Sequence, residues 1–177
     1  TFSTRTQSVS KKKKNSHFKE YTDIENIKYY PNTFGYADKD GTIPDVVITE
    51  KIHGTNFRFG KLKKDSNTWY QRLWNRFTGD YEFVVGSRHV QQKFGSGKTW
   101  HEQKGTIAEN VYTTMAKRLN AKEWCPENYI VFGEIYGKGI QDLTYGLNDY
   151  SFVCFDVMYN DGVTERYLDY DELVGFC

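Results

Sequence analysis

One lysine of this sequence stands where it could act as a nucleophile. Lys51 follows an apolar run, and Gly54 comes three residues later, where a glycine lets the backbone turn closely around phosphate oxygens. A lysine amine attacks a phosphoanhydride only when it is neutral, so a site that uses Lys51 must favour loss of its proton. A surface lysine beside a turn glycine is also common, so this pair alone leaves both interpretations open.

The residues that follow Lys51 make the pattern more specific. Segment 51–57, Lys-Ile-His-Gly-Thr-Asn-Phe, resembles the nucleotidyl-acceptor motif of the RNA ligase 2 family, which includes phage RNA-repair ligases and trypanosome RNA-editing ligases. Together with later motifs, the resemblance covers residues 46 to about 160. It implies that Lys51 becomes loaded with AMP and that His53, beside the triphosphate, assists this adenylylation.

The resemblance also implies roles for residues in three later segments. Arg88, which closes a strand-like run, would pair with phosphate through a planar fork that a lysine could not reproduce. Glu134, in a Phe-Gly-Glu segment, would accept a hydrogen bond from the ATP ribose, whose hydroxyls are donors. Phe155 would stack on adenine, and Asp156 would support the pocket or its metal.

Selectivity for adenine must come from contacts with the base edge, because stacking tolerates any base. The family makes these contacts at the positions of Glu50 and of the Ile52 backbone, and Asn56 belongs to the same nucleotide-binding set. By resemblance, Gln141 lies near the substrate RNA strand. The sequence departs from the phage enzymes at Ser87, where they carry a lysine that contacts phosphate.

The implied activity is that of an ATP-dependent RNA ligase: lysyl-AMP formation, transfer of AMP to an RNA 5′-phosphate, and attack by a 3′-hydroxyl that seals a nick. ATP and Mg²⁺ or Mn²⁺ are the expected cofactors, and RNA ends in a nicked duplex are the expected partner. DNA ligases and mRNA-capping nucleotidyltransferases share the lysine chemistry but usually carry Asp-Gly after the lysine. A noncatalytic nucleotide-binding or assembly subunit is the remaining alternative.

Two segments of the complete family enzymes have no counterpart after Asp156. These are a Glu-Gly-x-Val segment that binds metal and a Lys-x-Lys segment that grips the α-phosphate. Segment 161–163, Asp-Gly-Val, comes too soon after the preceding strand, and 160–162, Asn-Asp-Gly, is typical of a hairpin turn. We therefore expect a nucleotidyltransferase domain that is truncated at its C-terminal side, and that binds ATP without sealing nicks alone.

Composition favours a single α+β domain. The 177 residues suit one domain with a core, and an aromatic content of 17% favours a sheet-rich interior. With 24 Lys and Arg against 23 Asp and Glu, the net charge of +1 requires any nucleic-acid surface to be local. The resemblance implies a covalent nucleotidyltransferase (ATP-grasp-like ligase) domain, with antiparallel sheets around a nucleotide cleft.

Hydrophobic patterns predict the elements that position these residues. Apolar and alternating runs predict strands at residues 45–49, 57–59, 81–85, 129–132 and 151–158. Apolar residues recur every four positions between Glu102 and Leu119, which predicts an amphipathic helix. A second helix is expected after Leu168, with Asp169 as its cap. Residues 61–80 are polar and aromatic and are expected to form an excursion or long hairpin.

The remaining features concern the N-terminus and the compartment. Residues 1–19 lack acidic residues and include four consecutive lysines, which predicts a flexible basic arm before a domain at 20–177. A solvated tail, a phosphate-binding arm and a targeting remnant are all open interpretations of this arm. No apolar run approaches the roughly 20 residues that cross a bilayer, so no membrane partner is expected. Three scattered cysteines favour a reducing intracellular compartment, cytoplasmic or mitochondrial.

Overall fold

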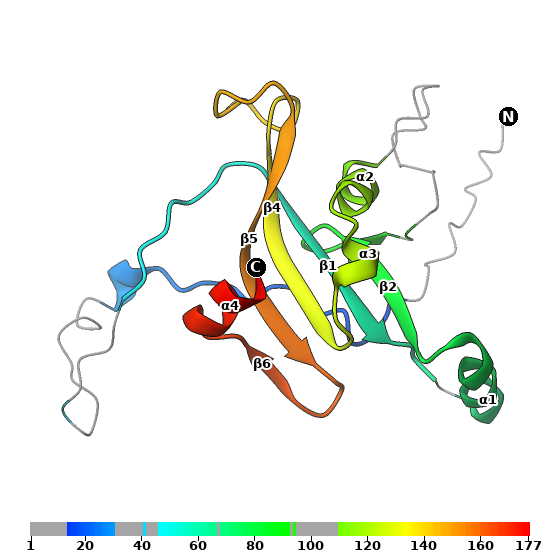
Figure 1. Cartoon of the computed structure of the whole chain (residues 1–177). Coiled ribbons are helices and arrows are strands. Elements are labelled where there is room, and N and C mark those ends of the chain that lie inside the picture. The colour runs from blue at the N-terminus through cyan, green and yellow to red at the C-terminus, as the bar shows by residue number, and fades with distance from the viewer. Residues whose placement is uncertain (1–13, 31–40, 42–45, 67, 93, 95–109) are drawn as a thin grey trace, which may run out of the picture.

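One antiparallel sheet forms the centre of the protein. The computed structural model describes residues 14–30, 41, 46–66, 68–92, 94 and 110–177. Within these residues, six strands lie in the order β3-β2-β1-β4-β5-β6 (Figure 1). The strands are β1 (Thr55–Lys63), β2 (Tyr81–Gly86), β3 (Gln91–Gln92), β4 (Tyr129–Gly137), β5 (Tyr150–Asn160) and β6 (Glu165–Tyr167). The predicted α+β class with antiparallel strands is confirmed.

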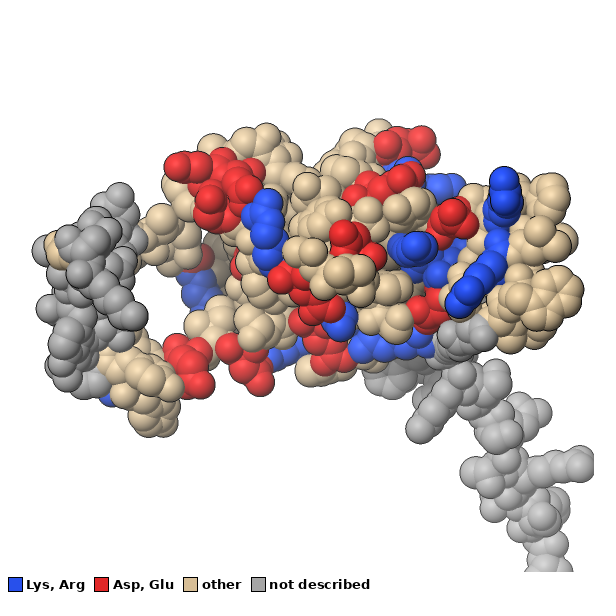
Figure 2. Space-filling model, turned by 90° about the horizontal axis from the view of Figure 1, so that it is seen from below, with Lys and Arg blue, Asp and Glu red and all other residues tan. Residues whose placement is uncertain are grey.

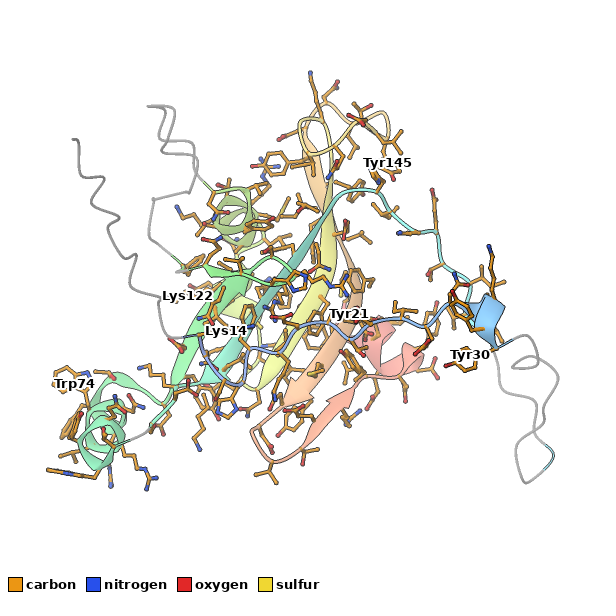
Figure 3. All side chains as sticks on the ribbon, turned by 180° about the vertical axis from the view of Figure 1, so that it is seen from behind. Lys14, Tyr21, Tyr30, Trp74, Lys122 and Tyr145 are labelled. Atoms are coloured by element: carbon orange, nitrogen blue, oxygen red, sulfur yellow. The ribbon has the colours of Figure 1, made fainter. Side chains whose placement is uncertain are left out.

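Alternating side chains divide the sheet into two apolar faces, because successive residues of a strand point to opposite sides. One face packs against the helices α2 (Val111–Arg118), α3 (Ala121–Trp124) and α4 (Tyr170–Phe176). Its buried strand residues are Phe57, Phe59, Val85, Val131, Ile135 and Val157. The other face carries buried Leu62, Val84, Ile130, Phe132 and Met158, together with Phe18. Residues 14–30, hereafter the N-terminal segment, cross this second face (Figure 3).

Residues 14–19 of the N-terminal segment pack into the folded domain, although the sequence pattern predicted that the domain starts at residue 20. Phe18 is 1% exposed and Asn15 is 3% exposed. The Asn15 side-chain amide donates hydrogen bonds to the Lys63 carbonyl at 3.0 Å and to Glu82 at 2.6 Å. Residues 1–13 of the predicted arm lie outside the described residues. A single buried phenylalanine among charged and polar neighbours was too weak a pattern to predict this anchoring.

The apolar run before Lys51 does not form the predicted strand. Residue 45 lies outside the described residues, and residues 46–50 have no regular secondary structure. Val46, Val47 and Ile48 are 49% to 92% exposed. No strand among the described residues pairs with this run, and a strand needs partners for its backbone groups. Lys51 consequently lies in a loop ahead of β1 and not at the end of a core strand.

A helix replaces the predicted excursion between β1 and β2. Helix α1 (Trp69–Thr78) follows the end of β1, and its apolar residues recur at helical spacing. It projects from the side of the sheet where β2 lies (Figure 1).

The helix predicted between Glu102 and Leu119 is confirmed over Val111–Arg118, where the Asn110 side chain caps α2 by accepting a hydrogen bond from Tyr112 N. Its predicted beginning at 102–109 lies outside the described residues.

Two predictions from short sequence patterns, a helix cap and a hairpin turn, are confirmed within residues 160–177. Asp169 caps α4 in a capping box, in which Asp169 and Glu172 each accept a hydrogen bond from the other's backbone. Residues 160–162 form the turn between β5 and β6, where Gly162 has φ 90°. Of the helices that the structure describes, none has the length and apolarity needed to cross a membrane. A short 3-10 helix, η1 (Ile27–Tyr29), lies in the N-terminal segment.

Candidate functional site

The motif of residues 51–57 runs from an exposed loop into β1. Lys51 is exposed, and the strand begins at Thr55. Alternation directs Thr55 toward α2, where its hydroxyl lies 3.0 Å from the hydroxyl of Tyr112. Asn56 points to the opposite face and stands directly across from Glu134 of β4. The motif thus joins the helix-covered core to the face that the N-terminal segment crosses.

Glu134 is the carboxylate that lies beside Gly54 of the motif. Burial raises the pKa of Glu134, and this effect is opposed by the nearby Gly54 backbone N–H and by the side chains of Lys51 and His53. A Cβ at position 54 would lie 2.2 Å from the Ile135 carbonyl oxygen. Only glycine therefore lets the loop that contains Lys51 lie this close to β4 and Glu134.

The loop between β4 and β5 holds the motif from another side. The Tyr145 hydroxyl accepts a hydrogen bond from the His53 backbone N–H at 2.7 Å. Gln141 donates from its side-chain amide to the Gly54 carbonyl at 3.3 Å. Tyr145, labelled in Figure 3, adopts φ 52°, which is uncommon for a residue with a side chain. The sequence did not identify Tyr145, because only this contact across the fold distinguishes it from other exposed tyrosines.

A bulge in β5 places Phe155 and Asp156 beside the N-terminal segment. The pairing of β4 with β5 shifts register between Phe132 and Gly133, and Phe155 is the β5 residue left without a partner. Its ring is 38% exposed and meets the ring of Tyr21 edge-on, with the centroids 5.0 Å apart. Phe155 therefore keeps an accessible ring on the same face as Asn56 and Glu134.

Asp156 is anchored by two hydrogen bonds. Burial raises the pKa of Asp156, while the Tyr21 hydroxyl and the Val157 N–H, which donate to it at 2.9 Å and 2.8 Å, lower it. Burial and the bond to Asp156 raise the pKa of Tyr21, so this hydroxyl keeps its proton at neutral pH. Tyr21 also packs against Phe132 and Tyr167. Sequence reasoning missed Tyr21, which resembles any other tyrosine of a polar segment.

Arg88 is tied to the N-terminal segment by a charge pair with Asp23. The preceding residue, Ser87, accepts a hydrogen bond on its carbonyl from Arg58 Nε at 3.0 Å. Arg58 is fully buried, stacks on the Phe18 ring at 4.2 Å, and donates to the Phe18 carbonyl at 3.1 Å. Burial lowers the pKa of Arg58 to about 10, so it stays charged at neutral pH. The sequence showed Arg58 only as one residue of an alternating strand.

Several described residues have groups that could contact a nucleotide. Asn56 Oδ1 is buried and has no donor among the described residues, and a ribose hydroxyl would supply one. Phe155 offers a ring, and Glu134 a carboxylate, on the same face. By contrast, the part of the chain that the structure describes contains no group of three His, Cys, Asp or Glu side chains that could hold a metal. Both oxygens of Asp156 already accept hydrogen bonds.

Three further residues of the predicted nucleotide-binding set are Glu50, Ile52 and Arg88. Glu50 is exposed and Ile52 is half-buried, both in the loop that contains Lys51. Their contacts with a base edge stay a prediction. Arg88 pairs with Asp23 and not with another residue of the predicted nucleotide-binding set.

The sequence matches the model of a protein family described as RNA ligase over residues 44–177. A comparison with curated proteins finds no match. The matched range contains Lys51, Glu134 and Phe155. The N-terminal segment, with Tyr21 and Asp23, lies before it.

Proposed function

Because the chain belongs to the RNA ligase family, we propose that it is an ATP-dependent RNA ligase of the RNA ligase 2 family, with Lys51 as the residue that receives AMP. The observation that carries this proposal is the close packing of Gly54 against β4, where an added Cβ would lie 2.2 Å from the Ile135 carbonyl oxygen and 3.0 Å from Glu134 Cγ. This packing supports a nucleophile at Lys51 near a ribose acceptor at Glu134, with the exposed Phe155 ring on the same face of the sheet.

In the first step, the neutral Lys51 amine attacks the α-phosphorus of ATP. A nitrogen–phosphorus bond forms, the bond to the bridging oxygen breaks, pyrophosphate leaves, and the lysine nitrogen loses its proton. The backbone around Gly54 can approach the phosphates closely, and Arg88 would pair with phosphate after releasing Asp23. A divalent cation, Mg²⁺ or Mn²⁺, would neutralise phosphate charge and draw much of its coordination from phosphate oxygens and water.

The nucleoside would lie on the face that carries Asn56, Glu134 and Phe155. We assign the ribose hydroxyls to Glu134 and Asn56, which face each other across β1 and β4. Adenine would stack on Phe155, with its edge read by Glu50 and the Ile52 backbone. For Asp156 we propose a supporting role through Tyr21, because both of its oxygens are already engaged.

The next two steps act on RNA. The 5′-phosphate of one RNA end attacks the phosphorus of lysyl-AMP, which frees the Lys51 amine and leaves AMP joined to the RNA. A 3′-hydroxyl then attacks the former 5′-phosphate, loses its proton, and releases AMP as the phosphodiester forms. For Gln141, whose side chain donates to the Gly54 carbonyl, we propose a contact with the RNA end that approaches Lys51.

Covalent labelling with ATP that carries radioactive α-phosphate tests this function. With Mg²⁺ or Mn²⁺, the wild-type chain and the complete product of its reading frame are compared. Lys51→Ala and Lys51→Arg should both lose the label, because the first lacks the amine and the guanidinium of the second stays protonated. Lys122→Ala, at another exposed lysine, is the matched control and should label normally.

Unfolding temperatures should be unchanged in all three variants, since neither Lys51 nor Lys122 is buried. Label retained by Lys51→Ala would overturn the assignment of the nucleophile. ATP binding without any label, in both the chain and the complete product, would instead identify a noncatalytic nucleotide-binding module.

A further inference from the structure

Helix α1 turns its apolar side chains toward solvent. The side chains of Trp69, Tyr70, Leu73, Trp74 and Phe77 are each 52% to 80% exposed. The helix is fastened by a polar residue instead: Asn75 is 8% exposed and donates to the Ser66 hydroxyl at 3.1 Å. Burial of apolar surface therefore does not explain why five large side chains are gathered on this helix.

The exposed side chains form one continuous stripe with a positive border. At about 100° per residue, the five apolar positions of α1 fall within an arc of about 140°. Arg72 and Arg76 lie along one edge of this arc, and the helix contains no acidic residue. Among the described residues, neither guanidinium pairs with a carboxylate. Elsewhere, the face seen in Figure 2 mixes both signs of charge, so this border is a local feature.

A groove of about 740 Å³ runs beside the stripe. Trp74 and Phe77 contribute to its lining from α1, and Asn15, Asp65 and Glu82 contribute from the body of the domain. Glu82 already accepts a hydrogen bond from Asn15 at 2.6 Å. An entering ligand therefore meets aromatic rings on one wall and a polar wall on the other. The two carboxylates of the polar wall, Asp65 and Glu82, each already accept a hydrogen bond.

Charge selects among the partners that such a surface could bind. A second copy of α1 would bring guanidinium groups together, with no carboxylate on either helix to pair with them. A bilayer surface needs a flat apolar face, whereas this stripe borders a groove with a polar wall. A polyanion with flat, apolar groups satisfies both features, because its charges pair with arginine and its planes stack on aromatic rings.

We propose that α1 and its groove bind a single-stranded stretch of the RNA substrate. Bases stack on Trp69, Trp74 and Phe77, and backbone phosphates pair with Arg72 and Arg76. This inference rests on the proposed function for the identity of the polyanion. The RNA ends themselves react elsewhere, at Lys51.

The proposed RNA contact at α1 lies away from Lys51, where the proposed reaction takes place. The nine residues of β1 lie between Gly54 and the segment that leads to α1, which corresponds to about 30 Å of extended strand. Trp74 and Tyr145 lie at opposite ends of the molecule in Figure 3. Substitutions on α1 should therefore weaken RNA binding and leave lysyl-AMP formation unchanged.

Fluorescence anisotropy with labelled single-stranded RNA measures the proposed contact. The double variant Trp69→Ala/Trp74→Ala should bind RNA at least about tenfold more weakly, since each stacked base contributes a factor of roughly 5 to 150. Arg72→Gln/Arg76→Gln should lower the slope of log affinity against log salt by about 1.4, because each phosphate contact contributes about 0.7 for single strands. Tyr170→Ala and Lys122→Gln, at exposed positions elsewhere, should match the wild type.

Lysyl-AMP labelling, sedimentation and vesicle binding are measured on the same proteins. Unchanged RNA affinity and salt slope would overturn the inference, and the loss of self-association or of vesicle binding alone would assign α1 to that partner instead. RNA binding that depends on α1 in a chain that never forms lysyl-AMP would support the inference while the proposed function fails. If the variants unfold, photo-crosslinking of RNA to the wild type decides: cross-links within 69–77 support the proposal, and cross-links only elsewhere contradict it.

Discussion

Asp23 and Arg88 form an ion pair that joins the N-terminal segment to the end of β2. The Asp23 side chain is 94% exposed, so the pair contributes little to stability. Under the proposed function this pair would compete with phosphate, because a guanidinium that binds phosphate must first leave the carboxylate. We therefore propose that the N-terminal segment occupies Arg88 when no nucleotide is bound.

Replacing the competing carboxylate should improve nucleotide binding. Asp23→Asn removes the charge that holds Arg88, and we expect the Kd for ATP, measured by calorimetry, to fall about two- to fivefold, the range of an exposed ion pair. The unfolding temperature should not change. Glu25→Gln removes an exposed charge from the same segment and should leave the Kd unaltered. Equal affinities for the two variants and the wild type would contradict a phosphate role for Arg88.

Tyr21→Phe should destabilise the protein in a manner that depends on pH. The lost hydrogen bond favours the ionised form of Asp156 and contributes about 1.5 kcal/mol at pH 7. This contribution is fully present above the Asp156 pKa of the Tyr21→Phe protein, which the lost bond leaves higher than that of the wild type. It disappears as the pH falls through the wild-type pKa. Because burial raises that pKa, the loss begins above the ordinary value near 3.9.

Urea unfolding of wild type and Tyr21→Phe from pH 7 to pH 4 measures this difference. Tyr167→Phe, in the same aromatic cluster, is the control, since its hydroxyl accepts from Thr22 N at 3.3 Å and does not reach Asp156. A difference between Tyr21→Phe and wild type that stays constant with pH would show that the bond to Asp156 is not its origin.

Phe155→Ala should weaken ATP binding more than it weakens the fold. Loss of a stacked base costs about 1–3 kcal/mol of binding free energy. Because the ring is 38% exposed, the loss of stability should stay below the roughly 3–5 kcal/mol of a fully buried phenylalanine. Thermal unfolding with and without ATP separates the two effects, with Tyr170→Ala as the exposed aromatic control. Normal stabilisation by ATP in Phe155→Ala would exclude stacking.

Local patterns in the sequence predicted the elements that short-range chemistry determines. Alternation located β1 and β5, and the Asp169 cap and the turn before β6 followed from residues within a few positions of one another. The run 46–48 failed as a strand, because strand formation also requires a partner. Helix α1 was missed because its aromatic residues favour strands by propensity, although their spacing is helical.

The contacts that build the site join residues far apart in the sequence, so no local pattern could predict them. Tyr21 and Asp156 are separated by 135 positions, and only the strand order brings the N-terminal segment over β5. The face to which Phe155 points depends on a bulge, and a shift of one residue reverses the side of every side chain beyond it. Lys51 and Glu134, by contrast, could be proposed from the sequence because both lie within recognisable motifs.

Gly54→Ala is the sharpest test of how the motif is held against β4. A methyl group at position 54 would lie 2.2 Å from the Ile135 carbonyl oxygen and 3.0 Å from Glu134 Cγ. Relief requires the loop to move away from Ile135 and Glu134. The rest of the β1–β4 ladder, from Thr55 to Lys61, can persist, so we expect only about 1–3 kcal/mol of destabilisation.

Adenylylation should suffer far more than stability in this variant. A displacement of about 1 Å at a reacting group can cost about a hundredfold in rate, and we expect a loss of that order in the initial rate of covalent labelling. Gly175→Ala, in α4, is the matched control, because nothing lies within 4 Å of its added Cβ and its labelling should stay normal. If Gly54→Ala labels at the wild-type rate and unfolds at the wild-type temperature, the close approach of the motif to β4 is not required for the reaction. The nucleophile would then be positioned by groups other than Glu134.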